Sequence, residues 1–137
     1  MTKEEAKEVL MYHRFTHEDI KTPKAENGFL GMLRPFRGEL IEANYHEIME
    51  AIKTLADELE AEDKVDKKTI SALWGICYLG RTWGLHPDGM LRRNNLIKQE
   101  QIQELEGWIE DISYATMSLL DGNGIEVAFE PYNERNK

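Results

Sequence analysis

Cysteine and long hydrophobic runs are the features that this 137-residue sequence lacks most clearly. The single cysteine, Cys77, excludes an internal disulfide and leaves one thiolate to offer a metal ion. No apolar run approaches the roughly 20 residues that a membrane-spanning helix needs. Residues 1–7 are mostly charged or polar, whereas a secretory signal turns apolar after its first few positions. We therefore expect a cytoplasmic protein that has no membrane partner.

Basic residues are also few: 17 Lys and Arg stand against 26 Asp and Glu, which gives a formal net charge of −9. Proteins that bind nucleic acid usually present a basic face, because the release of counterions from phosphate supplies much of their affinity. An acidic chain repels both nucleic acid and anionic lipid over most of its surface. The charge therefore predicts no nucleic-acid partner and favours another protein, with a basic protein among the options. It leaves self-association as a homo-oligomer open.

Strict alternation of apolar and polar residues, internal repeats and Pro/Gly/Ser-rich linkers are missing as well. Helical spacing of apolar residues recurs instead, in a composition of 41% hydrophobic and 31% charged residues. We predict one compact all-α domain over residues 1–137, arranged as a bundle or as an orthogonal array, with a long ordered loop at 16–38. Its four main helices are expected at residues 3–15, 39–60, 67–83 and 98–120, with one helical turn at 90–93.

The segment 67–83 is apolar nearly all round, which is typical of a central helix enclosed by the others. This pattern places Trp74 in the core. Gly75, Gly80 and Gly84 lower the helix propensity of the segment, so we expect neighbouring elements to approach it closely at these positions.

The helix ends and the tail carry further signals. Thr2 followed by Glu5 forms the capping-box pattern at the start of the first helix. Asp66 is placed to cap the third helix. In the tail, Val127 and Phe129 are expected to dock before the end of the chain frays.

Histidine is scarce, yet two sets of potential metal ligands occur with helical spacing. Imidazole and carboxylate groups at i,i+4 can hold a divalent ion. The second set faces away from the apolar stripe of its helix, where a metal would be poorly shielded. We predict no metal site and no cofactor. The two sets are His13, His17, Glu18 and Asp19, and Glu42, His46 and Glu50.

Assembled catalytic motifs are missing too. A magnesium-dependent phosphohydrolase site made of helices needs carboxylates on two facing helices, and residues 67–83 contain none. Cys77 shares an apolar stripe with Ile70 and Trp74, where a thiol behaves as a small buried hydrophobe. Neither a Gly-x-Ser-x-Gly elbow nor a Gly-rich phosphate loop is present. We assign no catalytic residue, and the sequence favours a non-catalytic protein without deciding whether it is an enzyme.

Arginine supplies the most informative pattern. Arg81 falls on the same face as Ile70 and Trp74, which predicts a buried guanidinium that must be paired. The preferred interpretation is a structural ion pair with Glu106 or Asp111. The alternative is a pocket for a carboxylate or phosphate group, since arginine forks bind both bidentately. That pocket would consist of Arg81, Trp83, His86, Arg92, Arg93 and Asn94.

A run of acidic residues closes the second helix and is a candidate docking surface for a basic partner. It comprises Asp57, Glu58, Glu60, Glu62 and Asp63.

Two functional classes follow from these patterns. The first is a small acidic protein-interaction or regulatory module, such as an adaptor or an immunity-type inhibitor. The second is a protein, binding or catalytic, that takes a small anionic or phosphate-containing ligand at the arginines. An enclosed cavity lined by Arg81, Arg92 or His86 would favour the second class, and a flat acidic face would favour the first.

Overall fold

Helices make up the regular structure of the described part of the chain. The computed structural model describes residues 1–16, 21–61 and 63–137. Apart from one isolated bridge between Leu33 and Phe36, the regular elements among these residues are helical, so the predicted all-α class is confirmed. The elements are α1 (Lys3–Arg14), α2 (Pro23–Glu26), α3 (Phe29–Leu33), α4 (Glu42–Thr54), α5 (Ala56–Glu60), α6 (Lys67–Gly80), η1 (Arg81–Leu85), α7 (Met90–Arg93), α8 (Gln99–Leu120), α9 (Ile125–Ala128) and α10 (Glu130–Arg135).

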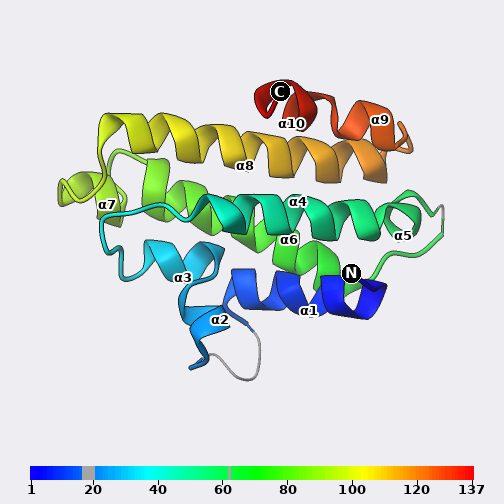
Figure 1. The fold of residues 1–137 in the computed structure, drawn as a ribbon, viewed down its shortest axis with the longest axis horizontal. Coiled ribbons are helices and arrows are strands. Elements are labelled where there is room, and N and C mark those ends of the chain that lie inside the picture. Colours follow the sequence, from blue (N-terminus) through cyan, green and yellow to red (C-terminus); the bar gives the residue numbers. More distant parts are fainter. Residues whose placement is uncertain (17–20, 62) are drawn as a thin grey trace.

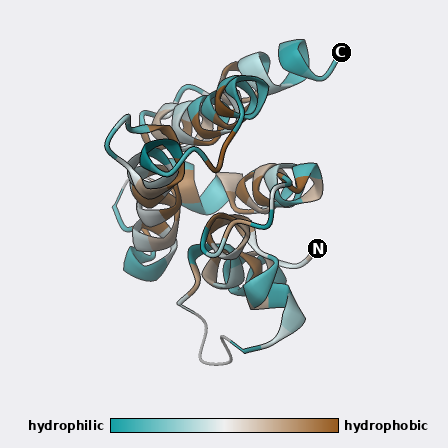
Figure 2. Ribbon diagram, turned by 90° about the vertical axis from the view of Figure 1, so that its left-hand side faces the viewer, coloured by the Kyte–Doolittle hydropathy of each residue, from teal (hydrophilic) through white to brown (hydrophobic). Residues whose placement is uncertain are grey.

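The four long helices lie along the long axis of the molecule. In Figure 1, α8 runs above α4 and α6, and α1 runs below them. Both α1 and α8 pack against α4 and α6, so the fold is a bundle and not an orthogonal array. The end-on view shows hydrophobic residues gathered on the sides of the helices that face one another (Figure 2). None of the helices in the described residues is both long enough and apolar enough to cross a bilayer.

The first and last long helices begin where the sequence predicts. At the start of α1, the Glu5 N–H donates to Thr2 Oγ1 at 3.1 Å, and the Thr2 N–H donates to Glu5 Oε1 at 2.9 Å. This reciprocal capping box satisfies two of the N–H groups that a helix start leaves free. On α8, the apolar residues at helical spacing face the core of the bundle, and Leu105, Ile109 and Ile112 are fully buried.

The second helix is divided, and the prediction of one helix over 39–60 is wrong in this respect. α4 begins only at Glu42 and ends at Thr54, and α5 follows. The Thr54 hydroxyl donates to the Glu50 carbonyl at 2.9 Å, a type of bond that bends helices. The apolar stripe nevertheless continues across the break, because Leu55 and Leu59 are both buried.

The predicted long loop between the first two main helices contains two short helices, α2 and α3. Thr22 caps α2, since its Oγ1 accepts the Ala25 N–H at 3.3 Å. All five residues of α3 are buried, so this segment contributes to the core of the bundle. The loop is ordered where it is described, as predicted from its apolar residues.

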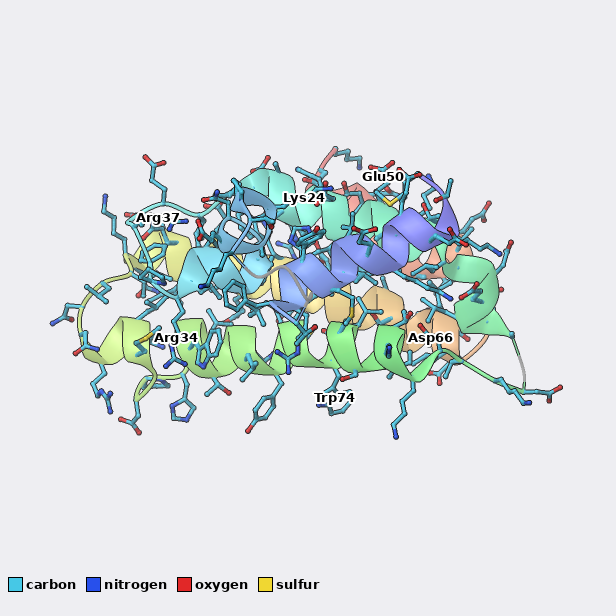
Figure 3. The ribbon with its side chains drawn as sticks, turned by 90° about the horizontal axis from the view of Figure 1, so that it is seen from below. Lys24, Arg34, Arg37, Glu50, Asp66 and Trp74 are labelled. Carbon is cyan, nitrogen blue, oxygen red and sulfur yellow. The ribbon has the colours of Figure 1, made fainter. Side chains whose placement is uncertain are left out.

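The prediction of an enclosed third helix is wrong. α6 ends at Gly80 and continues into η1, a wider π-helical turn. Trp74 is 74% exposed and Tyr78 is 61% exposed, and Trp74 projects away from the body of the molecule in Figure 3. α6 contacts α1, α3 and α8, and the outward side that carries these two aromatic residues remains exposed. The all-round apolar pattern therefore includes one side that this fold does not bury.

Close approach at the α6 glycines is confirmed, although the neighbours are side chains. A Cβ atom on Gly84 would lie 2.5 Å from Cδ2 of Leu105 on α8. A Cβ atom on Gly75 would overlap the Arg14 side chain, which lies across this part of α6. These two glycines therefore allow α1 and α8 to pack tightly on α6.

The C-terminal tail forms α9 and α10 over one end of α8. Phe129 is buried, as predicted, but Val127 is 39% exposed and does not dock. The predicted fraying is also wrong, because Arg135 and Asn136 form hydrogen bonds with buried residues of α4 and α8.

Candidate functional site

Arg81 is exposed at the start of η1, so the prediction of a buried guanidinium is wrong. Its Nη2 donates to the Ser113 hydroxyl on α8 at 3.2 Å. Asp111 is bonded to a different arginine, Arg135, whose Nε lies 2.7 Å from the carboxylate. The predicted ion pair of Arg81 with Glu106 or Asp111 is therefore not formed, and no buried carboxylate in the described part of the chain depends on Arg81.

The other basic residues of the predicted anion pocket do not converge. Arg92 Nη1 donates to the carbonyl of Leu85 at 2.9 Å, so this guanidinium supports the end of η1. Arg93 and Asn94 are exposed at the end of α7. Of the six predicted residues, only Arg81 and His86 line the same hollow.

Trp83 is half-buried and has a separate partner. The Arg34 guanidinium lies 5.2 Å from the centroid of the Trp83 ring, in a cation–π contact. Arg34 and Arg37 both lie toward one end of the molecule, opposite to the end that holds Asp66 (Figure 3). The Arg37 guanidinium donates to Asn27 Oδ1 at 2.8 Å. Arg34 therefore attaches its part of the chain to η1, and Arg37 joins the segment after α3 to the residue after α2.

A groove of about 1150 Å³ runs between α6–η1 on one bank and α8 on the other. It is open to solvent, so it is neither the enclosed cavity nor the flat acidic face that the sequence left as alternatives. Its walls are mainly apolar. Trp74 and Tyr78 stand on the α6 bank, and Met117 and Leu120, which are 50% and 42% exposed, stand on the α8 bank.

The two banks carry opposite charge. Residues 67–85 contain no Asp or Glu, and of their three basic residues, Lys67, Lys68 and Arg81, it is Arg81 that lines the groove. Residues 99–120 contain five acidic residues and no Lys or Arg. Glu106 and Glu110 are exposed and line the groove opposite Arg81. The groove is therefore an apolar trough with a basic edge and an acidic edge.

Cys77 lies in the groove but is not a reactive thiol. Its residue is buried, and this burial raises the pKa of the thiol to about 11, although the nearby Arg81 opposes the shift. The nucleophilic form of cysteine is the thiolate. At neutral pH Cys77 is protonated, which agrees with its prediction as a small buried hydrophobe.

A buried polar network lies beside the groove on the α8 side. The Asp111 carboxylate, 2% exposed, accepts the Tyr45 hydroxyl at 2.5 Å and both Nε and Nη2 of Arg135. Asn136 donates to the Tyr45 oxygen at 3.0 Å. Burial and the bond to Asp111 together raise the pKa of Tyr45 above its usual value. Sequence reasoning missed this network, and its one available signal was an acidic residue inside the apolar stripe of α8.

A second hollow, of about 720 Å³, lies on the other side of Trp74. Arg14 and Lys67 contribute to its lining together with Tyr78. The Arg14 Nε is buried without a hydrogen-bond partner in the described part of the chain. Trp74 and Tyr78 therefore form an aromatic ridge between two hollows, and both hollows have a basic residue beside the ridge.

The histidines of the two potential metal sets are used within the bundle where the structure describes them. His13 is buried between Glu47, 2.7 Å from its Nε2, and the Phe29 N–H, which donates to its Nδ1 at 3.0 Å. His46 lies between Glu42 and Tyr132. His17, Glu18 and Asp19 lie outside the described residues. Within the described residues, no three His, Cys, Asp or Glu side chains converge as metal ligands would.

The acidic run at 57–63 is partly neutralised by the chain itself. Lys7 Nζ lies 3.0 Å from Glu58 Oε2. Asp57 and Asp63 are exposed, and Glu60 is half-buried. Glu62 lies outside the described residues.

Comparison of the chain with protein-family models, with curated proteins and with solved structures finds no match.

Proposed function

We propose that this chain is a non-catalytic protein-interaction module, acting in the cytoplasm as an adaptor or inhibitor, and that the groove between α6–η1 and α8 binds a segment of another polypeptide. The observation that carries the proposal is the exposure of Trp74 and Tyr78 along the apolar groove. Large aromatic residues supply much of the binding energy at protein interfaces. Contiguous exposed apolar surface is uncommon on monomeric proteins unless it has a partner.

The size and openness of the groove favour a polypeptide over a small anion. Sites for small ligands bury most of the ligand surface in a cleft, with a few polar groups that converge on it. Here Arg81 is held by Ser113, and Arg92 is held by the Leu85 carbonyl. An amphipathic helix bound in the groove would place its apolar residues, at positions i, i+3, i+4 and i+7, against the apolar residues that line the groove.

The state of two titratable groups at the groove supports a non-catalytic role. Cys77 is protonated at neutral pH because it is buried. The buried carboxylate of Asp111 is fully engaged by Tyr45 and Arg135. Neither group is free to act as a base or as a nucleophile toward a molecule in the groove.

Site-specific photo-crosslinking tests the proposal. A photoreactive phenylalanine at position 78, on the groove, is compared in the native cell with the same residue at position 96. Leu96 is the matched control, because it is 49% exposed but does not line the groove. We expect a polypeptide adduct at position 78 that is absent at 96 and is lost in a Trp74→Glu background. Adducts of equal yield at both positions, or none at position 78, would refute the proposed function.

A further inference from the structure

We infer that the polypeptide in the groove is a second copy of this chain, so that two copies form a two-fold dimer with α6 of each packed over α8 of the other. This inference rests on the proposed function, because it names the partner that occupies the groove. Three features carry it: the charges of the two banks, the register of the two helices and the aromatic ridge.

The opposite charges of the banks are self-complementary. In a two-fold dimer, each surface meets its equivalent on the other copy, so a patch must match itself. A single basic or acidic patch would repel its own copy. Here the basic edge with Arg81 and the acidic edge with Glu106 and Glu110 lie side by side. Rotation by 180° about an axis parallel to the helices places each edge over the opposite edge of the second copy.

The register of the helices agrees with this pairing. Gly80 packs on Ile109 and Gly84 packs on Leu105, so α6–η1 and α8 run antiparallel with these residues at the same axial levels. A two-fold axis parallel to the helices preserves these levels. The backbone of Arg81 of one copy then lies at the level of Trp108 of the other, between Glu106 and Glu110 and within one helical turn of each.

The aromatic ridge falls on apolar residues in the same arrangement. Trp74 lies seven residues, or about two turns, before Arg81. On the antiparallel helix α8, the same distance beyond Trp108 leads to Ala115, and Met117 and Leu120 follow at about half a turn and one and a half turns. Trp74, Met117 and Leu120 are exposed and line the groove. Trp74 of each copy would therefore pack against Met117 of the other, with Leu120 beyond it, and these contacts occur twice.

Sedimentation equilibrium of the full chain, with charge-reversal variants, tests the inference. Wild-type protein is expected to sediment at twice 15.9 kDa. Arg81→Glu and Glu110→Arg each place two like-charged pairs in the dimer, so each should weaken dimerisation at least tenfold. The matched control is Glu104→Arg, since Glu104 is exposed on α8 but does not line the groove. It should dimerise like the wild type, and circular dichroism checks that every variant is folded.

The decisive sample is an equimolar mixture of Arg81→Glu and Glu110→Arg. In a mixed dimer, the introduced glutamate of one chain meets the introduced arginine of the other. At the second, symmetry-related contact, the unaltered Glu110 of the first chain meets the unaltered Arg81 of the second, so both contacts are attractive. We expect the mixture to recover the wild-type dimer. A monomeric wild type, a dimer that neither variant weakens, or a mixture that stays monomeric would each overturn the inference.

The crosslinking experiment separates this inference from the proposed function. An adduct at position 78 that has twice the mass of the chain and joins position 78 to a peptide of α8 supports both, whereas a crosslink to α8 within one chain does not count as an adduct. An adduct with a different polypeptide upholds the proposed function and overturns the inference. No specific adduct overturns both.

Discussion

At the scale of single residues, Asp111 joins three segments through its contacts. Its carboxylate is almost fully buried on α8 and accepts hydrogen bonds from Tyr45 on α4 and Arg135 in the tail. A buried carboxylate is tolerated only when it is paired and fully bonded. This one residue therefore fixes the positions of three segments that are far apart in the sequence.

Replacement of Arg135 should destabilise the protein. Arg135→Ala removes the cation from Asp111 and should lower the free energy of unfolding by about 2–3 kcal/mol, as for hydrogen bonds to charged groups. The partial exposure of Arg135 lets water replace some of the lost contact. Chemical denaturation measures the loss. Lys137→Ala is the control, because the Lys137–Glu134 pair is exposed and should contribute below about 0.5 kcal/mol. Equal effects of the two substitutions would contradict the role given to Asp111.

His13 is held in one tautomer by its two partners. The Phe29 N–H donates to Nδ1, so the ring proton is on Nε2 and is donated to Glu47. This bond lowers the pKa of Glu47 below its usual value of 4.5. The pair connects α1 with α4, and the backbone bond connects α1 with the start of α3.

The depressed pKa of Glu47 predicts a specific pH dependence. The unfolded chain takes up a proton at Glu47 before the folded chain does, so this contribution to stability is present above pH 4.5 and is lost as the pH falls through the folded pKa. Glu47→Gln keeps an acceptor for His13 but cannot titrate. Its free energy of unfolding should therefore fall less steeply than that of the wild type between about pH 5 and 3, the usual carboxyl range. Glu104→Gln is the control and should keep the wild-type slope. An unchanged slope in Glu47→Gln would show that the pair is not linked to folding.

At the scale of elements, α6 differs from the other long helices in having two apolar sides. Its inner side carries Leu73 and Ile76, which are buried in the bundle. Its outer side carries Trp74 and Tyr78, which are not. The inner side contributes to the stability of the fold, and the outer side is the one that we propose binds a partner.

Two tryptophan substitutions should separate these sides. Trp74→Ala should change the free energy of unfolding by less than about 1 kcal/mol, because the side chain is exposed. Trp108→Ala should cost about 3–5 kcal/mol, because Trp108 is buried and stacks on Tyr45. Both are measured by denaturation in the Glu110→Arg background, so that self-association does not contribute. A large loss with Trp74→Ala would mean that α6 is enclosed after all.

The helices could be predicted from the sequence, but their neighbours could not. The narrow stripes of α4 and α8 identify one inward face each, and both faces are buried as predicted. α6 is apolar all round, and periodicity alone does not distinguish a side covered by the same chain from a side left for a partner. The break after Thr54 was missed because a hydroxyl bond to a backbone carbonyl leaves no mark on the apolar pattern.

At the scale of the whole molecule, charge is unevenly distributed. Residues 64–98 contain seven Lys and Arg against two Asp and Glu, in a chain whose net charge is −9. The net charge therefore describes the average surface but conceals a basic strip along α6 and α7. The groove lies where this strip meets the acidic surface of α8.

The basic strip should not make the protein a nucleic-acid binder. Arg81, its cation at the groove, lies opposite Glu106 and Glu110 of α8, which repel phosphate. Fluorescence anisotropy with duplex DNA at physiological salt should show no binding tighter than the nonspecific range of about 10⁻⁴–10⁻⁶ M. Salt-sensitive binding in the nanomolar range that Arg81→Glu abolishes would contradict this expectation.

The candidate site was predicted only in part, because it depends on contacts between distant segments. Arg81 and His86 line the groove, whereas the other four residues of the predicted anion pocket do not. Arg92 bonds a backbone carbonyl, and Trp83 is covered by Arg34, which comes from the segment between α3 and α4. Such pairings depend on the packing of the bundle. They are not encoded in local spacing.

The three tryptophans occupy three different environments, and this has an optical consequence. In the single chain, Trp108 is shielded in the core, Trp83 lies under a guanidinium, and Trp74 is in water. Their fluorescence should therefore contain a blue component, emitted at shorter wavelength by Trp108, and a red component, emitted at longer wavelength by Trp74. Acrylamide should quench the red component first. Unfolding shifts the blue component, whereas occupation of the groove shields the red one. A single emission spectrum of the unlabelled protein thus distinguishes loss of the fold from arrival of a partner.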